Sequence, residues 1–275
     1  MDRHHLIAAQ EGLTKCQTES EDGGASALLG LLESIHGPIA PGASILDLGC
    51  GVGRCVGAML ERGHDAWGVD VYEYWDRDRD LYWESEPPEL PAEVTSRLRL
   101  ASLVPYELPF ADSSFDHIVS TQVLEHVDDL DAVFGEIART LRPGGTSVHI
   151  FPSAWAPPIE GHIGVPFPLL CHNPAYLKLM AIAGFRSPRQ RGLRWREVYR
   201  SNLEQMEVTH YPGRRKMLTK ARRAGLSAEF IHDPVNARPM FARLYEKLSA
   251  LGMPGAAKRI LMMVQQPRLL LSLPR

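Results

Sequence analysis

Hydrophobic and polar positions follow two patterns over the first 150 residues. Short apolar runs bounded by polar or glycine-rich stretches are typical of buried strands, and apolar residues spaced three and four apart are typical of helices. The runs that predict strands are Ser44–Leu48, Ala66–Val71, Arg97–Ser102, Asp116–Thr121 and Thr146–Pro152. The spacing that predicts helices covers Ala25–His36, Arg54–Arg62 and Asp129–Leu141. Strands that alternate with helices predict an α/β fold with a doubly wound, mostly parallel sheet.

The pattern changes after Pro152. Five prolines lie between Pro157 and Pro174, and arginine becomes frequent after them. This composition predicts a loop and helical insertion. The later patterns predict a helix over Arg214–Ala224, a strand over Ser227–His232, a helix over Pro239–Leu251 and a strand near Arg259–Val264. We therefore divide the chain into a sheet-forming part (1–152), the insertion (153–210) and a C-terminal part that completes the same sheet (211–275).

Two segments could supply the helix that returns the chain to the sheet. Asn173–Ala183 is followed by glycine and phenylalanine, and Met217–Gly225 is followed at once by strand-like residues. The stretch after the first candidate, Arg186–Arg196, is too polar for a central strand. We therefore prefer the second candidate.

Composition limits the class of protein. The chain has 275 residues, of which 44% are hydrophobic and 23% charged, as in a soluble globular domain. Its four cysteines form no C-x-x-C pair and no close Cys/His set with zinc spacing, so neither a disulfide framework nor a metal site is predicted. A reducing cytoplasm is the simplest location. No apolar run reaches the roughly 20 residues that span a bilayer, and no signal peptide is visible.

The formal net charge of -3 conceals an asymmetry. Residues 1–150 hold 10 Lys and Arg against 26 Asp and Glu, whereas residues 151–275 hold 20 against 7. Such a division indicates either a basic surface for an anionic partner or two halves that neutralise each other. The charge pattern leaves these two interpretations open.

The strongest local motif is the strand–turn–helix junction at Ile45–Arg54. Glycines in such a turn let the backbone approach a ligand closely, and the helix N-terminus offers free N–H groups. The dinucleotide fingerprint G-x-G-x-x-G is not met, because its third glycine would fall at Arg54. The pattern is G-x-G-x-G, with Asp47 two residues before the first glycine. Asp70 ends the next strand, where a carboxylate can accept hydrogen bonds from ribose hydroxyls.

Together with this junction, three later motifs carry a family resemblance. They are Leu108-Pro109-Phe110-Ala111-Asp112-Ser113-Ser114-Phe115-Asp116, Val123-Leu124-Glu125-His126-Val127 and Leu141-Arg142-Pro143-Gly144-Gly145. In order and spacing, the sequence resembles the class I S-adenosylmethionine-dependent methyltransferases that act on small molecules, lipids and sugars. The resemblance implies a Rossmann-like, mostly parallel seven-stranded sheet with a substrate lid inserted after the fifth strand.

The resemblance also implies roles for individual residues toward S-adenosylmethionine. The glycines would cradle its methionine part, and Asp47 would orient the loop. Asp70, followed by Val71, would hold the ribose, Ser102 and Leu103 would lie by the adenine, and Gln122 would lie near the methionine end. The family often has Asp where this chain has Ser102. The positions implied for the cofactor are thus Asp47, Gly49, Gly51, Gly53, Asp70, Val71, Ser102, Leu103 and Gln122.

Candidate catalytic residues lie at the rim of the expected cleft. A general base is needed only if the acceptor is a hydroxyl or a protonated amine. We hypothesise that His162 is this base and that Glu160, two residues earlier, fixes its tautomer. His126 follows the fourth strand and is a further candidate. The alternatives are that His126 is a packed histidine and that His162 and Glu160 are ordinary polar residues of the insertion.

The resemblance favours an O-methyltransferase whose acceptor is small or carbohydrate-like. The arginines of the insertion either bind an anionic acceptor or only balance the acidic half of the chain. An RNA methyltransferase would also use a basic half, but few aromatic residues interleave with the arginines to stack bases, so nucleic acid is the weaker hypothesis. A protein that binds S-adenosylmethionine without catalysis is the third alternative.

Overall fold

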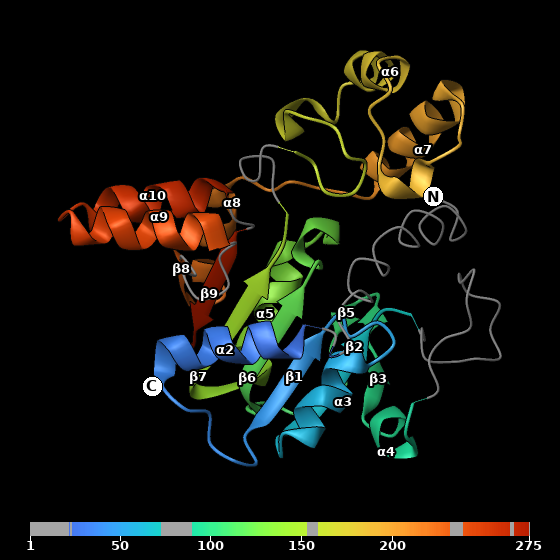
Figure 1. Cartoon of the computed structure of the whole chain (residues 1–275). Coiled ribbons are helices and arrows are strands. Elements are labelled where there is room, and N and C mark those ends of the chain that lie inside the picture. The colour runs from blue at the N-terminus through green and yellow to red at the C-terminus, as the bar shows by residue number, and fades with distance from the viewer. Residues whose placement is uncertain are drawn as a thin grey trace.

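The computed structural model describes residues 22, 24–72, 90–152, 159–231, 239–264 and 267–274. Its centre is a seven-stranded sheet in the order β3-β2-β1-β6-β7-β9-β8 (Figure 1). The strands are β1 (Ser44–Leu48), β2 (Asp65–Asp70), β3 (Leu98–Leu100), β6 (Phe115–Thr121), β7 (Leu141–Ile150), β8 (Ser227–Ile231) and β9 (Arg268–Ser272). β9 runs antiparallel to both of its neighbours, β7 and β8, and the other adjacent pairs of this sheet are parallel. The predicted doubly wound, mostly parallel fold is confirmed.

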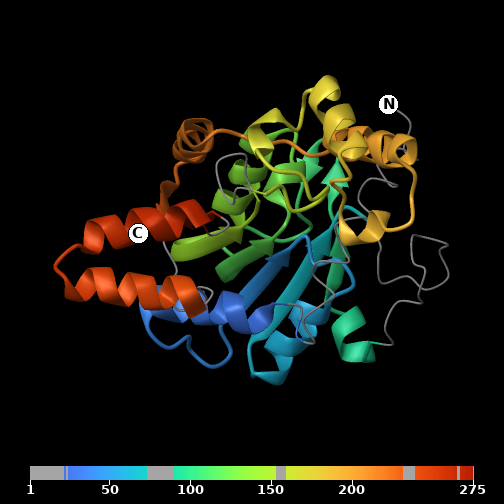
Figure 2. The same cartoon turned by 45° about the horizontal axis from the view of Figure 1, so that its top comes forward.

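Helices cover both faces of the sheet, as Figures 1 and 2 show. One face packs against α2 (Ala25–His36) and α3 (Arg54–Glu61), and the opposite face packs against α5 (Leu130–Thr140) and α8 (Arg214–Arg223). The central strands are apolar on both sides for this reason. Ile45 belongs to the first core and Leu46 to the second, and both side chains are fully buried. The continuous apolar runs of the sequence are thus strands buried between two helical layers.

The sheet reverses its winding between β1 and β6. From β1 the order proceeds outward to β2 and β3, and from β6 it proceeds outward to β7. In open α/β sheets, ligands bind beyond the carboxyl ends of the strands at such a reversal. The loops that follow Leu48 and Thr121 therefore flank the expected crevice.

Hydrogen bonds explain the motif around Leu108. Glu136 on α5 accepts the backbone N–H of Leu108 at 2.7 Å, and Arg139 donates to the carbonyl oxygens of Leu108 and Phe110. Arg139 also pairs with Asp112 at 2.8 Å. These contacts hold the loop before β6 against α5.

Two predicted strand boundaries were wrong. β3 ends at Leu100 instead of Ser102, because Ser102 and Leu103 form β4 (Ser102–Leu103) and pair with β5 (Tyr106–Glu107) in a separate ribbon. β7 begins at Leu141 instead of Thr146, and its register against β6 shifts between Phe115 and His117. That shift accommodates the Arg142–Gly145 turn within the strand.

The strand predicted near Arg259–Val264 is a helix. It belongs to α10 (Pro254–Val264), which packs against α9 (Pro239–Ala250), and the strand follows as β9. Short apolar runs do not distinguish a buried helix from a strand by periodicity alone. In β9 the fully buried side chains are Leu269 and Leu271, which face the core beside β7.

The structure supports the second of the two candidates for the returning helix. α8 packs against α5 and leads directly into β8. The first candidate, α6 (Pro174–Ile182), packs instead against α7 (Trp195–Glu207) within the insertion. The described residues of the insertion, 159–210, have a small core of their own that includes Ile163, Leu177 and Met206. Figure 1 shows α6 and α7 beyond the ends toward which the parallel strands point.

No helix among the described residues is long and apolar enough to cross a bilayer. The remaining short elements are α4 (Ala92–Thr95) and the 3-10 turns η1 (Leu124–His126), η2 (Pro168–Leu170) and η3 (Pro188–Gln190).

Candidate active site

The loop between β1 and α3 requires its three glycines. Gly49, Gly51 and Gly53 have φ values of 78°, 53° and 84°, in the left-handed region that side chains rarely adopt. A Cβ atom on Gly49 would lie 2.2 Å from Cγ2 of Val123. The loop after β1 therefore packs directly against the segment that follows β6.

Asp70 holds this loop from the end of β2. Its two carboxylate oxygens accept the N–H groups of Gly51 at 2.8 Å and Val71 at 2.7 Å. Each carboxylate oxygen has a second lone pair, so the group can still accept hydroxyl protons from a ligand. Burial raises the pKa of Asp70 to about 6, although the backbone N–H groups oppose the rise.

Asp47 lies beneath the loop and is 5% exposed. Burial and the nearby Asp70 carboxylate raise its pKa to about 7, against a hydrogen bond from Cys55. Two crowded carboxyls of this kind are stabilised as carboxylates by a cationic group placed beside them. The loop thus fits a ligand that carries a positive charge and vicinal hydroxyls.

The remaining positions expected at the cofactor lie around the same strand ends. Gln122 follows β6 with a φ of 61°, and its N–H donates to Ile150 at 2.8 Å. Ser102 and Leu103 lie farther out, in the exposed ribbon after β3. The N–H of Ala101 donates to the carbonyl oxygen of Asp70, so this ribbon begins beside the end of β2.

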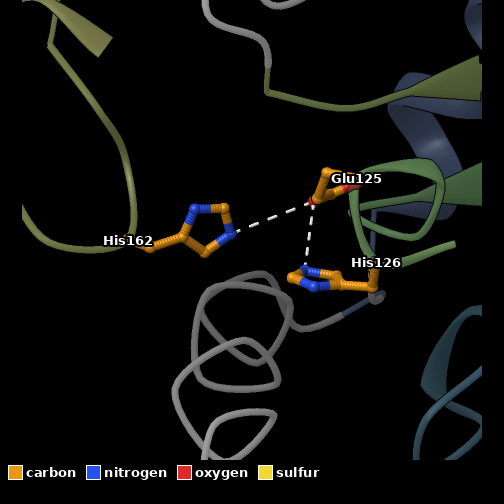
Figure 3. A group of neighbouring side chains, drawn as sticks. All are labelled: Glu125, His126 and His162. Atoms are coloured by element: carbon orange, nitrogen blue, oxygen red, sulfur yellow. Dashed lines mark ion pairs between the residues drawn. The ribbon is translucent and has the colours of Figure 1, made fainter. Parts of the chain in front are cut away.

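A second cluster contains two of the three predicted catalytic residues and one residue that we did not predict. His126 and Glu125 lie on η1, directly after β6, and His162 comes from the insertion (Figure 3). The Nε2 atoms of His126 and His162 lie 3.7 Å and 3.9 Å from Oε1 of Glu125. The two imidazole rings meet edge to face with centroids 5.6 Å apart.

Glu160 is hydrogen bonded to His162 and to two further groups. Its Oε1 accepts the Nδ1–H of His162 at 2.5 Å and the hydroxyl of Tyr211, and its Oε2 accepts the N–H of Ile163 at 2.6 Å. Burial opposes ionisation of Glu160, but these hydrogen bonds outweigh it and hold its pKa below the usual value. The Nε2 atom of His162 is left without a hydrogen bond among the described residues.

His126 is held in the same way by a different acceptor. Its Nδ1–H donates to the carbonyl oxygen of Val208 at 2.7 Å, and its Nε2 has no hydrogen-bond partner in the described part of the chain. Burial and the neighbouring His162 lower the pKa of His126 to about 3, so the ring is neutral at neutral pH.

Glu125 is the residue that sequence reasoning missed. Its side chain is fully buried, and neither carboxyl oxygen has a hydrogen-bond partner within the described ranges. Burial raises its pKa well above the usual value. The signal in the sequence is an acid next to a histidine directly after a predicted strand, in a motif used above only for family resemblance.

The C-terminal end of the insertion is hydrogen bonded to η1. The N–H of His210 donates to the carbonyl oxygen of Glu125 at 2.5 Å, beside the bond from His126 to Val208. The two parts of the histidine cluster, one on the sheet and one on the insertion, are therefore held together by backbone as well as side-chain contacts.

Comparison with known proteins supports the interpretation of the sheet. Residues 46–149 match the family model described as a methyltransferase domain. The matched region, which is less than half of the chain, is similar to that domain. It contains the glycine loop, Asp70 and the η1 residues Glu125 and His126, whereas the insertion lies outside the match.

Curated methyltransferases are similar to part of this chain. A sterol 24-C-methyltransferase of Gibberella zeae is 32% identical over 108 residues, which are 39% of this chain and 27% of that relative. A ubiquinone biosynthesis O-methyltransferase of Idiomarina loihiensis is 32% identical over 117 residues, which are 42% of this chain and 45% of that relative. The match thus spans less than half of either relative.

Among solved structures, phosphoethanolamine N-methyltransferase 2 of Haemonchus contortus, in complex with S-adenosyl-L-methionine, superposes with a TM-score of 0.50. The superposition covers 98% of this chain and 57% of that one at 16% sequence identity. At this identity, the similarity shows the fold that the two chains share.

Proposed function

We propose that the protein is an S-adenosylmethionine-dependent methyltransferase. The observation that carries the proposal is the contact between the glycine loop and the β2 carboxylate, in which Gly51 donates to Asp70 at 2.8 Å. This contact places an acid able to accept ribose hydroxyls beside a backbone loop that only glycine can form. The match of residues 46–149 to the methyltransferase domain adds independent support.

In this proposal Asp47 and Asp70 face the charged and hydroxylated parts of the cofactor. The sulfonium of S-adenosylmethionine supplies an activated methyl group, and transfer forms a bond from the acceptor atom to that methyl while the carbon–sulfur electron pair returns to sulfur. The chain's main contribution is to align the acceptor and to exclude water. The insertion, which is bonded to η1 through Val208 and His210, would cover the acceptor.

We propose that the acceptor is a small molecule methylated on a hydroxyl oxygen. A hydroxyl must lose a proton during transfer, and His162, which is oriented by Glu160, is the side chain assigned to its activation. This role is a proposal that rests on the Nε2 atom, which has no hydrogen-bond partner among the described residues, and on its position beside Glu125 of η1. The cofactor contacts of Ser102, Leu103 and Gln122 are proposals of the same kind.

An anionic acceptor has weaker support. Several basic side chains are already engaged within the protein: Arg186 donates to the carbonyl oxygen of Leu193, Arg196 stacks on Trp195, and Lys220 pairs with Asp131. These contacts favour the interpretation in which part of the basic half is engaged by its own surroundings. The proposed methylation of a hydroxyl oxygen is compatible with an uncharged, carbohydrate-like acceptor as well as with an anionic one.

The test measures S-adenosylhomocysteine production from S-adenosylmethionine with separate panels of hydroxylated small molecules and of RNA. We expect turnover with at least one hydroxylated compound and none with RNA. Turnover only with RNA, together with salt-dependent RNA binding, would support the RNA methyltransferase instead. Calorimetric binding of S-adenosylhomocysteine without turnover on either panel would support a protein that binds the cofactor without catalysis.

A further inference from the structure

The cluster of Glu125, His126 and His162 leaves an arrangement of polar atoms that protein contacts do not explain. Four of its nitrogen and oxygen atoms are buried and have no hydrogen-bond partner among the described residues: both carboxyl oxygens of Glu125 and the Nε2 atoms of His126 and His162. Buried polar groups in native proteins are nearly always paired. Three of these atoms, Oε1 of Glu125 and the two Nε2 atoms, lie within 4.8 Å of one another, which indicates a ligand that pairs them.

The imidazole tautomers are fixed from outside the cluster. Glu160 and the carbonyl oxygen of Val208 can only accept, so the Nδ1 atoms of His162 and His126 must carry the protons. Each Nε2 atom then presents a lone pair toward the carboxyl of Glu125 (Figure 3). A histidine that ligates a metal ion through one nitrogen characteristically donates from the other to a carboxylate or a backbone carbonyl.

We propose that Glu125, His126 and His162 bind a divalent first-row transition metal ion through Oε1 and the two Nε2 atoms. The three atoms lie within 4.8 Å of one another. Bonds of about 2.0 to 2.2 Å would separate ligand atoms by roughly 3.0 to 3.5 Å, so the present 3.7 Å and 3.9 Å separations must close by about half an ångström. Adjustments of this size lie within the range of small side-chain rotations.

Charge and ligand type agree with such an ion. A carboxylate buried without a partner is costly, and a divalent cation would offset this cost for Glu125 as well as for nearby Glu160. Two imidazoles with one carboxylate favour manganese, iron, cobalt, nickel or zinc over magnesium and calcium, which prefer oxygen ligands. Three protein ligands leave coordination positions open for water or for an oxygen of a second molecule.

The site would change how the acceptor is activated. Val123, two residues before Glu125, packs against the glycine loop, so the ion would lie near the cofactor crevice. A hydroxyl bound to the ion loses its proton to solvent more readily, because the ion stabilises the resulting oxygen anion. His162 would then act as a ligand instead of taking the proton itself. The activation of the acceptor hydroxyl rests on the proposed methyltransferase function. Metal binding by the three side chains does not.

The experiment uses the full chain without a histidine tag, stripped with a chelator and titrated with Mn²⁺, Co²⁺ and Zn²⁺ by calorimetry. We expect one ion per chain, binding lost in Glu125→Gln and His162→Ala, and binding weakened about 10- to 100-fold in Glu160→Gln, whose effect would pass through His162. His172→Ala is the matched control, because His172 lies in the same insertion and donates to Thr209 outside the cluster. The proposal would be overturned if the wild-type chain bound none of the ions, or if the Glu125 and His162 variants bound them as tightly as the wild-type chain.

A measurement on the wild-type chain guards against variants that fail to fold. Pulsed electron paramagnetic resonance of the chain loaded with Cu²⁺ should reveal coupling to imidazole nitrogen, and its absence would contradict the site.

Activity measurements separate the metal-site proposal from the proposed methyltransferase function. Metal binding without turnover on any acceptor would leave the site intact and count against the proposed function. Full turnover after chelation would leave the function intact and refute the role in activation.

Discussion

At the scale of single residues, the proposed cofactor crevice contains two carboxyl groups whose pKa values are raised by burial. Asp47 and Asp70 have pKa values raised to about 7 and about 6, and each raised value records a carboxylate that is short of stabilising partners. Asp70 has backbone N–H donors from Gly51 and Val71. Both acids could be found in the sequence, because each sits at a fixed place relative to a predicted strand end.

Replacement of Asp70 by Asn should weaken S-adenosylhomocysteine binding about 10- to 100-fold, since charge-assisted hydrogen bonds are worth about 1.5 to 3 kcal/mol. Calorimetry measures the change. Asp65→Asn is the matched control, because Asp65 begins the same strand at its opposite end, where it pairs with Arg97. Affinity retained by the Asp70 variant would contradict its assignment to the ribose and weaken the fold-based interpretation of the loop.

Cofactor affinity should depend on pH through the same two acids. As pH falls below 6 both carboxyls become largely protonated, so Asp47 attracts the positive ammonium of S-adenosylhomocysteine weakly and Asp70 accepts the ribose hydroxyls weakly. Above pH 7 both carboxyls are largely ionised. Affinity should therefore rise between pH 5.5 and 7.5, with proton release on binding, which calorimetry in two buffers of different ionisation enthalpy detects. Asp47→Asn should flatten the upper part of this rise. An affinity that is constant over the range would show that neither acid titrates in the binding equilibrium.

At the scale of elements, the glycine loop between β1 and α3 packs against the segment between β6 and η1. Gly49 has a left-handed backbone conformation and also packs against Val123. Glycine is therefore required at this position both for the turn and for the contact between the two segments. Sequence reasoning identified the loop from its glycines. It did not identify Val123 as the neighbour, because that contact depends on β1 and β6 lying side by side in the sheet.

Gly49→Ala should destabilise the fold by about 2 to 4 kcal/mol, the sum of left-handed backbone strain and overpacking against Val123. Gly63→Ala isolates the first contribution, because Gly63 has a φ of 81° with nothing within 4 Å of an added Cβ. Denaturant unfolding measures both, and Gly63→Ala should lose only about 1 kcal/mol. Val123→Ala should recover part of the loss in Gly49→Ala, and equal losses in the two glycine variants would disprove the contact.

At the scale of the whole molecule, the insertion has its own small core and, within the described residues, contacts the segment around η1. The hydrogen bonds of His126 to Val208 and of His210 to Glu125 form one junction, and the histidine cluster forms the other. If the cluster binds an ion, that ion links Glu125 and His126 on the sheet to His162 on the insertion. The order of the insertion should then respond to metal.

Hydrogen exchange in α6 and α7 should slow severalfold when the chelated chain is loaded with Zn²⁺, because a metal link reduces local opening of the insertion. Exchange in β1 serves as the internal reference and should stay the same. The Glu125→Gln variant should show no response to Zn²⁺ in either region. A response of the same size in that variant would mean that the ion acts elsewhere.

The amino-acid sequence by itself determined the main strands and helices of residues 1–152, the class of the sheet and the glycine loop that follows β1. Those features depend on local periodicity, on glycine geometry and on acids at strand ends. All three signals are local, so they can be recognised without knowing which segments lie side by side in the fold. The tertiary structure decided that residues 259–264 are helical, because a short apolar run fits either a helix or a strand until it has neighbours. It also decided that Glu125 and His126 converge with His162, since that convergence requires the insertion to fold back over the end of β6.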